Sequence, residues 1–204
     1  MNFPFLASLF VFLLVLGRVL KKNTRTMENE EQSFWQKERA ANSVRKKPLD
    51  DLEYISIPLE QLPIDVHKED PVVQDCVDIL STLKDCKIVN LTGITNTDLK
   101  LTYGTANITA LTEYDQNYTL LVTTLQKWAN QLHTLGDLAS AEAILEYAIS
   151  IRSDVTKTYL MLAEIYEKQG ASRRIQELVA AAEKLTTPSG KVILRKLQEI
   201  HSVL

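Results

Sequence analysis

The sequence predicts an all-α protein in which one N-terminal transmembrane helix and a mostly extended linker precede a short helical solenoid with a C-terminal capping helix. Three observations support this prediction: a strongly apolar stretch at residues 3–20, helical periodicity from residue 70 onward, and an internal repeat near the C-terminus. The chain contains only six Gly, six Pro and two Cys. These low numbers exclude a collagen-like, low-complexity or disulfide-stapled protein.

Residues 1–20 are predicted to form a transmembrane signal-anchor helix. Residues 3–20 carry one charge, Arg18, and as a helix they would reach about 27 Å, close to the roughly 30 Å hydrocarbon core of a bilayer. No basic residue precedes this stretch and no small-residue cleavage site follows it, so we expect it to be retained. Lys21, Lys22 and Arg25 lie on its C-terminal side, which predicts a single-pass cell membrane protein with a cytoplasmic C-terminal domain.

Residues 21–48 form a basic juxtamembrane arm. Nine Lys/Arg and four Glu give residues 18–47 a net charge of +5, whereas 14 basic and 22 acidic residues give the rest of the chain −8. Such an arm is attracted to anionic lipids, and a solvated linker that only enforces topology is the alternative. The candidate membrane-surface residues are Lys21, Lys22, Arg25, Arg45, Lys46 and Lys47.

Residues 49–69 are predicted to be an extended linker, because Pro58 and Pro63 disfavour both a helix and a central strand. Three aliphatic side chains alternate along it, Ile55, Ile57 and Leu59, and must be covered by another part of the protein. We therefore predict that this segment docks in cis on the C-terminal domain. A loosely ordered spacer is the alternative.

Residues 70–121 are predicted to be N-terminal helices that form a degenerate repeat or a cap. An acidic start and Pro71 in the first turn begin one amphipathic helix, and Gly104 is expected to end a second, short one. A further helix is expected to end near Tyr114, and the next to begin near Asn117.

Residues 122–189 contain two repeats that align without a gap at an offset of 34, so that Gly136 falls on Gly170. Small residues at equivalent positions would let helices approach closely, and a glycine would end the first helix of each repeat. Residues 190–204 form an amphipathic helix that is predicted to cap the stack. The structural repeat positions are Trp128, Ala129, Gly136, Ala141, Ala148, Tyr159, Leu162, Ala163, Tyr166, Gly170 and Ala182.

This spacing resembles the tetratricopeptide repeat (TPR), a helix–turn–helix unit with the same period, although Ile175 replaces the small residue that the family has in the second helix. The whole chain looks like an uncharacterised family of single-span, membrane-anchored bacterial TPR proteins. The resemblance implies a right-handed solenoid that binds peptides on its concave face. Asn130 matches a position that holds a peptide backbone or carboxylate in some members, but Gln126 replaces the usual lysine. The implied peptide-binding residues are Thr123, Gln126, Asn130, His133, Lys157, Leu160, Glu164 and Glu167.

The sequence carries no recognisable catalytic, cofactor or metal site. The three histidines are isolated, and no phosphate-binding or nucleophile motif occurs. We therefore predict that the protein is not an enzyme and needs no cofactor. A pI of about 5.7 argues against nucleic-acid binding.

These expectations together predict that the protein is a membrane-tethered TPR adaptor or scaffold, which binds a protein or peptide partner at the cytoplasmic face of the membrane. One alternative is a structural subunit of a membrane complex whose groove is filled in cis by residues 49–64. Another is an extracytoplasmic chaperone-like TPR protein, which requires the reverse topology.

Overall fold

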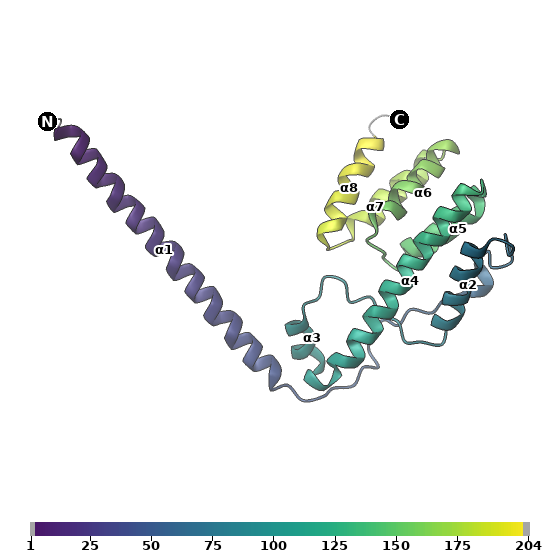
Figure 1. Ribbon diagram of the computed structural model, residues 1–204, viewed down its shortest axis with the longest axis horizontal. Helices are drawn as coiled ribbons and strands as arrows, with labels where there is room; N and C mark the ends of the chain where they lie inside the picture. Colours follow the sequence, from purple (N-terminus) through teal and green to yellow (C-terminus); the bar gives the residue numbers. More distant parts are fainter. Residues whose placement is uncertain (1–2, 202–204) are drawn as a thin grey trace. The chain divides into compact units, whose positions relative to one another are not determined.

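The computed structural model describes residues 3–201, and between residues 3 and 28 it describes only some of the side chains. The described residues are mostly helical and contain no β-strand beyond one isolated antiparallel bridge between Tyr54 and Val89. They form two compact units, residues 3–48 with 95–108 and residues 49–94 with 109–201. Figure 1 shows the helices of each unit.

The first unit contains the long helix α1 (Phe3–Asn42), the short helix α3 (Asn96–Tyr103) and a 3₁₀ turn η2 (Thr105–Asn107). Helix α1 continues without interruption from the predicted anchor into the predicted basic arm. Across the part of the chain that is described, none of the helices combines the length and apolarity needed to cross a bilayer. Most side chains of the predicted span lie outside the described residues.

Polar contacts attach α3 and η2 to the end of α1. Lys37 Nζ donates to Asp98 Oδ1 at 2.7 Å, and Lys100 pairs with Glu38. Gly104 is required at the next turn, because its φ is +88° and an added Cβ would clash with the Arg45 carbonyl oxygen.

In the second unit the sequence forms α2 (Pro71–Leu83), α4 (Ile108–Thr134), α5 (Leu138–Ser150), α6 (Thr156–Lys168), α7 (Ser172–Glu183) and α8 (Pro188–His201). A 3₁₀ turn, η1 (Leu59–Gln61), interrupts the extended segment that precedes α2. Asp70 caps α2 by accepting the backbone N–H groups of Val72 and Val73, as the acidic start with a first-turn proline predicts.

The predicted break between Tyr114 and Asn117 is wrong, since α4 is a single helix of 27 residues that continues through it. The polar side chains in this stretch do not cap a helix end. Asp115 Oδ1 instead accepts the backbone N–H of Leu91, and Asn117 Nδ2 donates to the Lys87 carbonyl. Because both side chains bond across to residues 87–91, they do not compete with the backbone hydrogen bonds of the helix.

The internal repeat is visible in the hydrogen bonds of the turns. The N–H of Asp137 donates to the Leu132 carbonyl and, at the equivalent turn of the second repeat, that of Ala171 donates to the Tyr166 carbonyl, both at 2.9 Å. The turn glycines have positive φ, +81° at Gly136 and +66° at Gly170. The other repeat positions are buried: Trp128, Ala129, Ala141, Ala148, Tyr159, Leu162, Ala163, Tyr166 and Ala182.

The extended segment before α2 packs on one side of the helical pairs. Ile57 is 3% exposed, and Ile55 and Leu59 are partly buried against the same apolar core. Tyr147 on α5 donates its hydroxyl to the Ser56 carbonyl at 3.3 Å. Further along, His67 Nε2 lies 3.4 Å from a carboxylate oxygen of Asp137, at the start of α5. The segment therefore runs antiparallel to α5, while α2 lies along α4.

Candidate functional site

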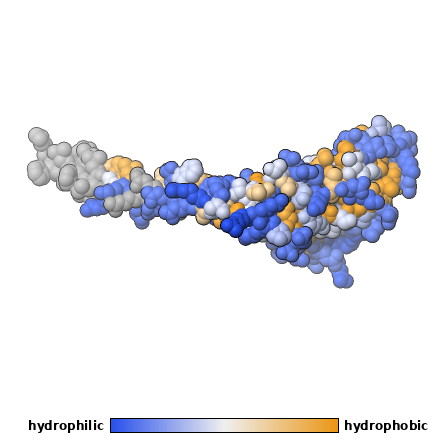
Figure 2. Space-filling view, turned by 90° about the horizontal axis from the view of Figure 1, so that it is seen from below, coloured by the Kyte–Doolittle hydropathy of each residue, from blue (hydrophilic) through white to orange (hydrophobic). Residues whose placement is uncertain are grey.

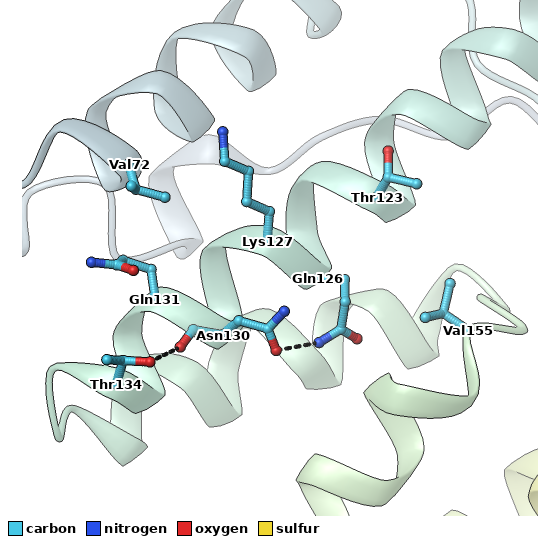
Figure 3. A pocket seen from close by; sticks show the side chains of 8 residues that line it. All are labelled: Val72, Thr123, Gln126, Lys127, Asn130, Gln131, Thr134 and Val155. Carbon is cyan, nitrogen blue, oxygen red and sulfur yellow. Dashed lines mark hydrogen bonds between the residues drawn. The ribbon is translucent and has the colours of Figure 1, made fainter.

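A groove lies over helix α4, between α2 and the start of α6. It encloses a cavity of about 410 Å³, within the roughly 300–1,000 Å³ that is usual for ligand pockets. Figure 3 shows its lining: Val72, Thr123, Gln126, Lys127, Asn130, Gln131, Thr134 and Val155. Two valines supply apolar walls, and α4 supplies a polar floor.

A chain of hydrogen bonds, buried at Thr158 and half-buried at Asn130, crosses the floor of the groove. Thr158, which is 1% exposed, donates its hydroxyl to Gln126 Oε1 at 2.6 Å. Gln126 Nε2 then donates to Asn130 Oδ1 at 2.9 Å. We call this set the Thr158–Gln126–Asn130 relay. It joins α6 to α4, and it orients the Asn130 amide so that Nδ2 remains as a donor toward the groove.

The other polar groups of the groove bond mostly within the protein. Thr134 donates its hydroxyl to the Asn130 carbonyl, and Thr123 bonds the α4 backbone in the same way. Lys127 pairs with Asp75 at 2.5 Å, and Gln131 donates to Asp70 at 2.7 Å. Among the described residues no partner engages Asn130 Nδ2, so a ligand with an oxygen acceptor is the natural complement.

The charged groups in and beside the groove already have partners within the protein. The groove's one cationic side chain, Lys127, has a raised pKa because it hydrogen-bonds to Asp75. The pKa of Asp70 is lowered because its carboxylate accepts the backbone N–H of Val73. These charged groups already have partners within α2 and α4, so the arrangement suits a neutral amide better than a free carboxylate.

The predicted concave-face residues fall into two sets. Thr123, Gln126 and Asn130 line the cavity, as do five residues that the sequence analysis did not select. Four of these five could have been found, since Lys127, Gln131 and Thr134 share the exposed face of α4 and Val155 precedes α6. Val72 reaches the groove only through the packing of α2.

The predicted residues beyond the cavity make other contacts. His133 Nε2 lies 3.9 Å from Glu164, whose pKa is lowered mainly by a hydrogen bond from Lys168. Leu160 packs against the core, whereas Lys157 and Glu167 are exposed. These five residues lie on or beside α6 and do not line the cavity itself.

The predicted cis-docking segment does not occupy this groove. Ile55, Ile57 and Leu59 are absent from its lining, and the hydroxyl of Tyr147 holds the segment on α5 instead. The groove is therefore open to solvent in the described chain.

Charge divides between the two structural units. Residues 1–48 and 95–108 contain ten Lys/Arg and five Asp/Glu, net +5, whereas the remaining residues contain 13 and 21, net −8. Of the predicted membrane-surface residues, Lys21, Lys22, Arg45, Lys46 and Lys47 are exposed, and the side chain of Arg25 is outside the described residues. Figure 2 shows hydrophilic and apolar side chains intermixed on the described surface.

Within the described residues no cluster of His, Cys, Asp or Glu is arranged to hold a metal ion. Comparison with known protein families, with curated proteins and with solved structures finds no match for this chain.

Proposed function

We propose that this chain is a membrane-tethered TPR adaptor whose groove binds an extended, uncharged segment of a partner protein at the cytoplasmic face of the membrane. The observation that carries this proposal is the Thr158–Gln126–Asn130 relay beneath an open groove. A peptide backbone carbonyl would accept from Asn130 Nδ2, and a small apolar side chain would fit between Val72 and Val155.

The repeated turn geometry supports the TPR assignment. Equivalent backbone hydrogen bonds recur at matching positions of the two repeats, and both turns contain a glycine with positive φ. Helices α5 to α8 also pack as successive neighbours, α5 on α6, α6 on α7 and both α6 and α7 on α8. These are the features that let helix pairs stack into a solenoid.

The tether is proposed for residues 3–20, on the apolar character of that stretch and its basic flank. The net positive charge of the first unit would favour an anionic leaflet, at about 1 kcal/mol for each basic residue near the surface. Tethering raises the effective concentration of the groove at the membrane. Fusion of a reporter to the C-terminus, together with alkaline extraction of membranes, tests both the orientation and the anchor.

Three Asn-x-Thr triplets, the acceptor pattern for N-linked glycans, begin at Asn90, Asn107 and Asn117, and the contacts of these side chains favour folding in a compartment without glycosylation. Asn107 is 2% exposed, and its Nδ2 donates to the carbonyls of Lys47 and Tyr103 at 2.7 Å. Asn90 and Asn117 likewise donate from Nδ2 to backbone carbonyls of other segments. A glycan replaces one of the two Nδ2 hydrogens, so it would remove one of the two bonds that the buried Asn107 donates. This argues against the extracytoplasmic alternative in a cell that attaches N-linked glycans.

The structural-subunit alternative requires residues 49–64 to fill the groove. Their packing on α5 rather than over α4 favours the adaptor.

A photocrosslinking experiment in cells tests the groove. A photoreactive side chain at Thr123 should crosslink a partner, whereas the same group at Arg173, which is 90% exposed on α7, should not. Asn130→Asp should abolish the Thr123 crosslink, because Asp still accepts from Gln126 but presents a carboxylate in place of the donor. A crosslink that survives Asn130→Asp, or that appears equally from Arg173, would reject peptide binding in this groove.

A further inference from the structure

The second structural unit ends in two exposed helical faces of opposite charge. The acidic end is the outer face of α2, and the basic end is the outer face of α8. Residues 71–85 contain three Asp and one Lys, net −2. Residues 184–201 have four Lys/Arg and one Glu, net +3.

On the acidic end, the exposed side chains of α2 recur at helical spacing. Gln74, Asp78 and Ser81 point outward, and Asp85 is exposed just beyond the helix. Gln74 donates to Asp78 Oδ1 at 2.7 Å, which leaves the other oxygen of that carboxylate for a partner. No basic residue in the described chain pairs with Asp78 or Asp85.

On the basic end, Lys191 and Arg195 lie four residues apart on one exposed face of α8, with Val192 beside them. The opposite face of α8 is buried, since Ile193 and Leu197 are 0% exposed. Neither Lys191 nor Arg195 has a carboxylate partner among the described residues. Glu199 lies one turn further along this face, and the outer face of this capping helix carries a net positive charge.

The two ends cannot neutralise each other within one copy. Helix α2 contacts α4 through the pairs Asp75–Lys127 and Asp70–Gln131, whereas α8 packs on α6 and α7. Figure 1 shows α2 and α8 on opposite flanks of the packed helices of this unit.

We propose that the basic end of one copy docks on the acidic end of a second copy, so that the helical units associate head to tail. The two helices match in length, with 13 residues in α2 and 14 in α8, each about 20 Å long. Lys191 and Arg195 would face Asp78 and Asp85. A second copy is the occupant that charge complementarity selects, because every copy carries both faces.

A head-to-tail contact is heterologous, so it produces a ring when its rotation closes and an open chain when it does not. The contact is independent of the proposed peptide groove, because none of Asp78, Asp85, Lys191 and Arg195 lines that cavity. The solenoid would thereby extend its own helical stack from one molecule to the next.

Sedimentation of the full chain in detergent micelles tests this association. The protein mass should at least double at an ionic strength of about 0.01 M, where the Debye length is about 30 Å. It should return to that of one chain at about 1 M, where the Debye length is about 3 Å.

Charge reversal identifies the faces. Asp78→Lys with Asp85→Lys, or Lys191→Glu with Arg195→Glu, should leave each variant monomeric at low salt. A mixture of the two variants should associate again, since each then offers the charge that the other lacks. Circular dichroism melting checks that each variant is folded. A control that reverses Glu113 and Glu167, two exposed residues elsewhere on the unit, should associate like the wild type.

Three results would overturn the proposal: a wild-type mass that corresponds to one chain at both salt concentrations, association that persists in either charge-reversal variant, or a mixture of the two variants that stays monomeric. The first would assign the charged ends to other partners, and the second would place the contact elsewhere, for example along α1.

Discussion

Replacement of Thr158 by valine should uncouple the groove floor from helix α6. Valine keeps the shape of the side chain but removes the hydroxyl that donates to Gln126 Oε1 at 2.6 Å. Thr158 is 1% exposed and Gln126 9% exposed, so water has little access to the oxygen that is left without a donor. A buried acceptor without a partner costs about 1–3 kcal/mol, and we expect the free energy of unfolding to fall by that amount.

A double-mutant cycle separates this bond from other effects of the substitution. Gln126→Leu removes the acceptor, and the double variant removes both partners, so its loss of stability should be smaller than the sum of the single losses by about 1–2 kcal/mol. Urea unfolding monitored by circular dichroism measures the cycle, with calorimetry to check that the second unit unfolds in one step.

The same variant should also weaken partner recognition. Without Thr158, the Gln126 amide is free to rotate, and Asn130 Nδ2 is no longer held toward the groove. The crosslink from Thr123 should therefore decrease in Thr158→Val even at temperatures where the protein is fully folded. Additive stability losses, within about 0.3–0.5 kcal/mol, would refute the relay.

Gly104→Ala should destabilise the first unit by more than the roughly 1–3 kcal/mol that its backbone conformation costs, because the added Cβ would also clash. Gly170→Ala has open space around it and should cost only about 1–2 kcal/mol. Hydrogen exchange of α3 and α6 compares the two losses of stability, and equal losses would contradict the clash. Cys86 should react with a thiol reagent at once and Cys76 only on unfolding, because burial raises the pKa of the Cys76 thiol to about 11; two fast thiols would refute this packing. The pKa of Asp70 is lowered by its hydrogen bond from the Val73 backbone, so its contribution to stability is present above the unfolded value of about 3.9 and is lost as pH falls through the folded one. Acid unfolding of Asp70→Asn should therefore depend less on pH below about 4, and an unchanged pH profile would exclude this role.

The helical pairs of residues 122–189 were predictable from local sequence. Glycines at the ends of the first helices and small residues at equivalent positions act over a few neighbouring residues, so the repeat alone was enough to locate both turns. The start of α2 was equally predictable from local sequence, since Asp70 caps the helix and Pro71 occupies its first turn.

The long helix α4 was not predictable in this way. Asp115 and Asn117 have the character of helix-cap residues, but their hydrogen-bond partners, Leu91 and Lys87, belong to a segment well before the helix begins. Only the fold brings those backbone groups within reach, and the helix then continues where its sequence alone predicts an interruption.

The candidate groove was predicted only in part. Thr123, Gln126 and Asn130 follow from the repeat resemblance and helical spacing, whereas Val72 lines the cavity only because α2 packs along α4. The bond from Thr158 to Gln126 likewise joins side chains on two different helices, α6 and α4.

The sequence by itself determined the helical class, the two repeats and their turns, because these depend on periodicity and on backbone preferences of single residues. The tertiary structure decided where residues 49–64 lie and therefore that the groove is open. An extended aliphatic segment has no hydrogen-bond pattern of its own, and several apolar faces could cover it equally well by hydrophobic burial. The specific bond from Tyr147 to Ser56 and the carboxylate beside His67 select α5, and such contacts exist only once the chain has folded.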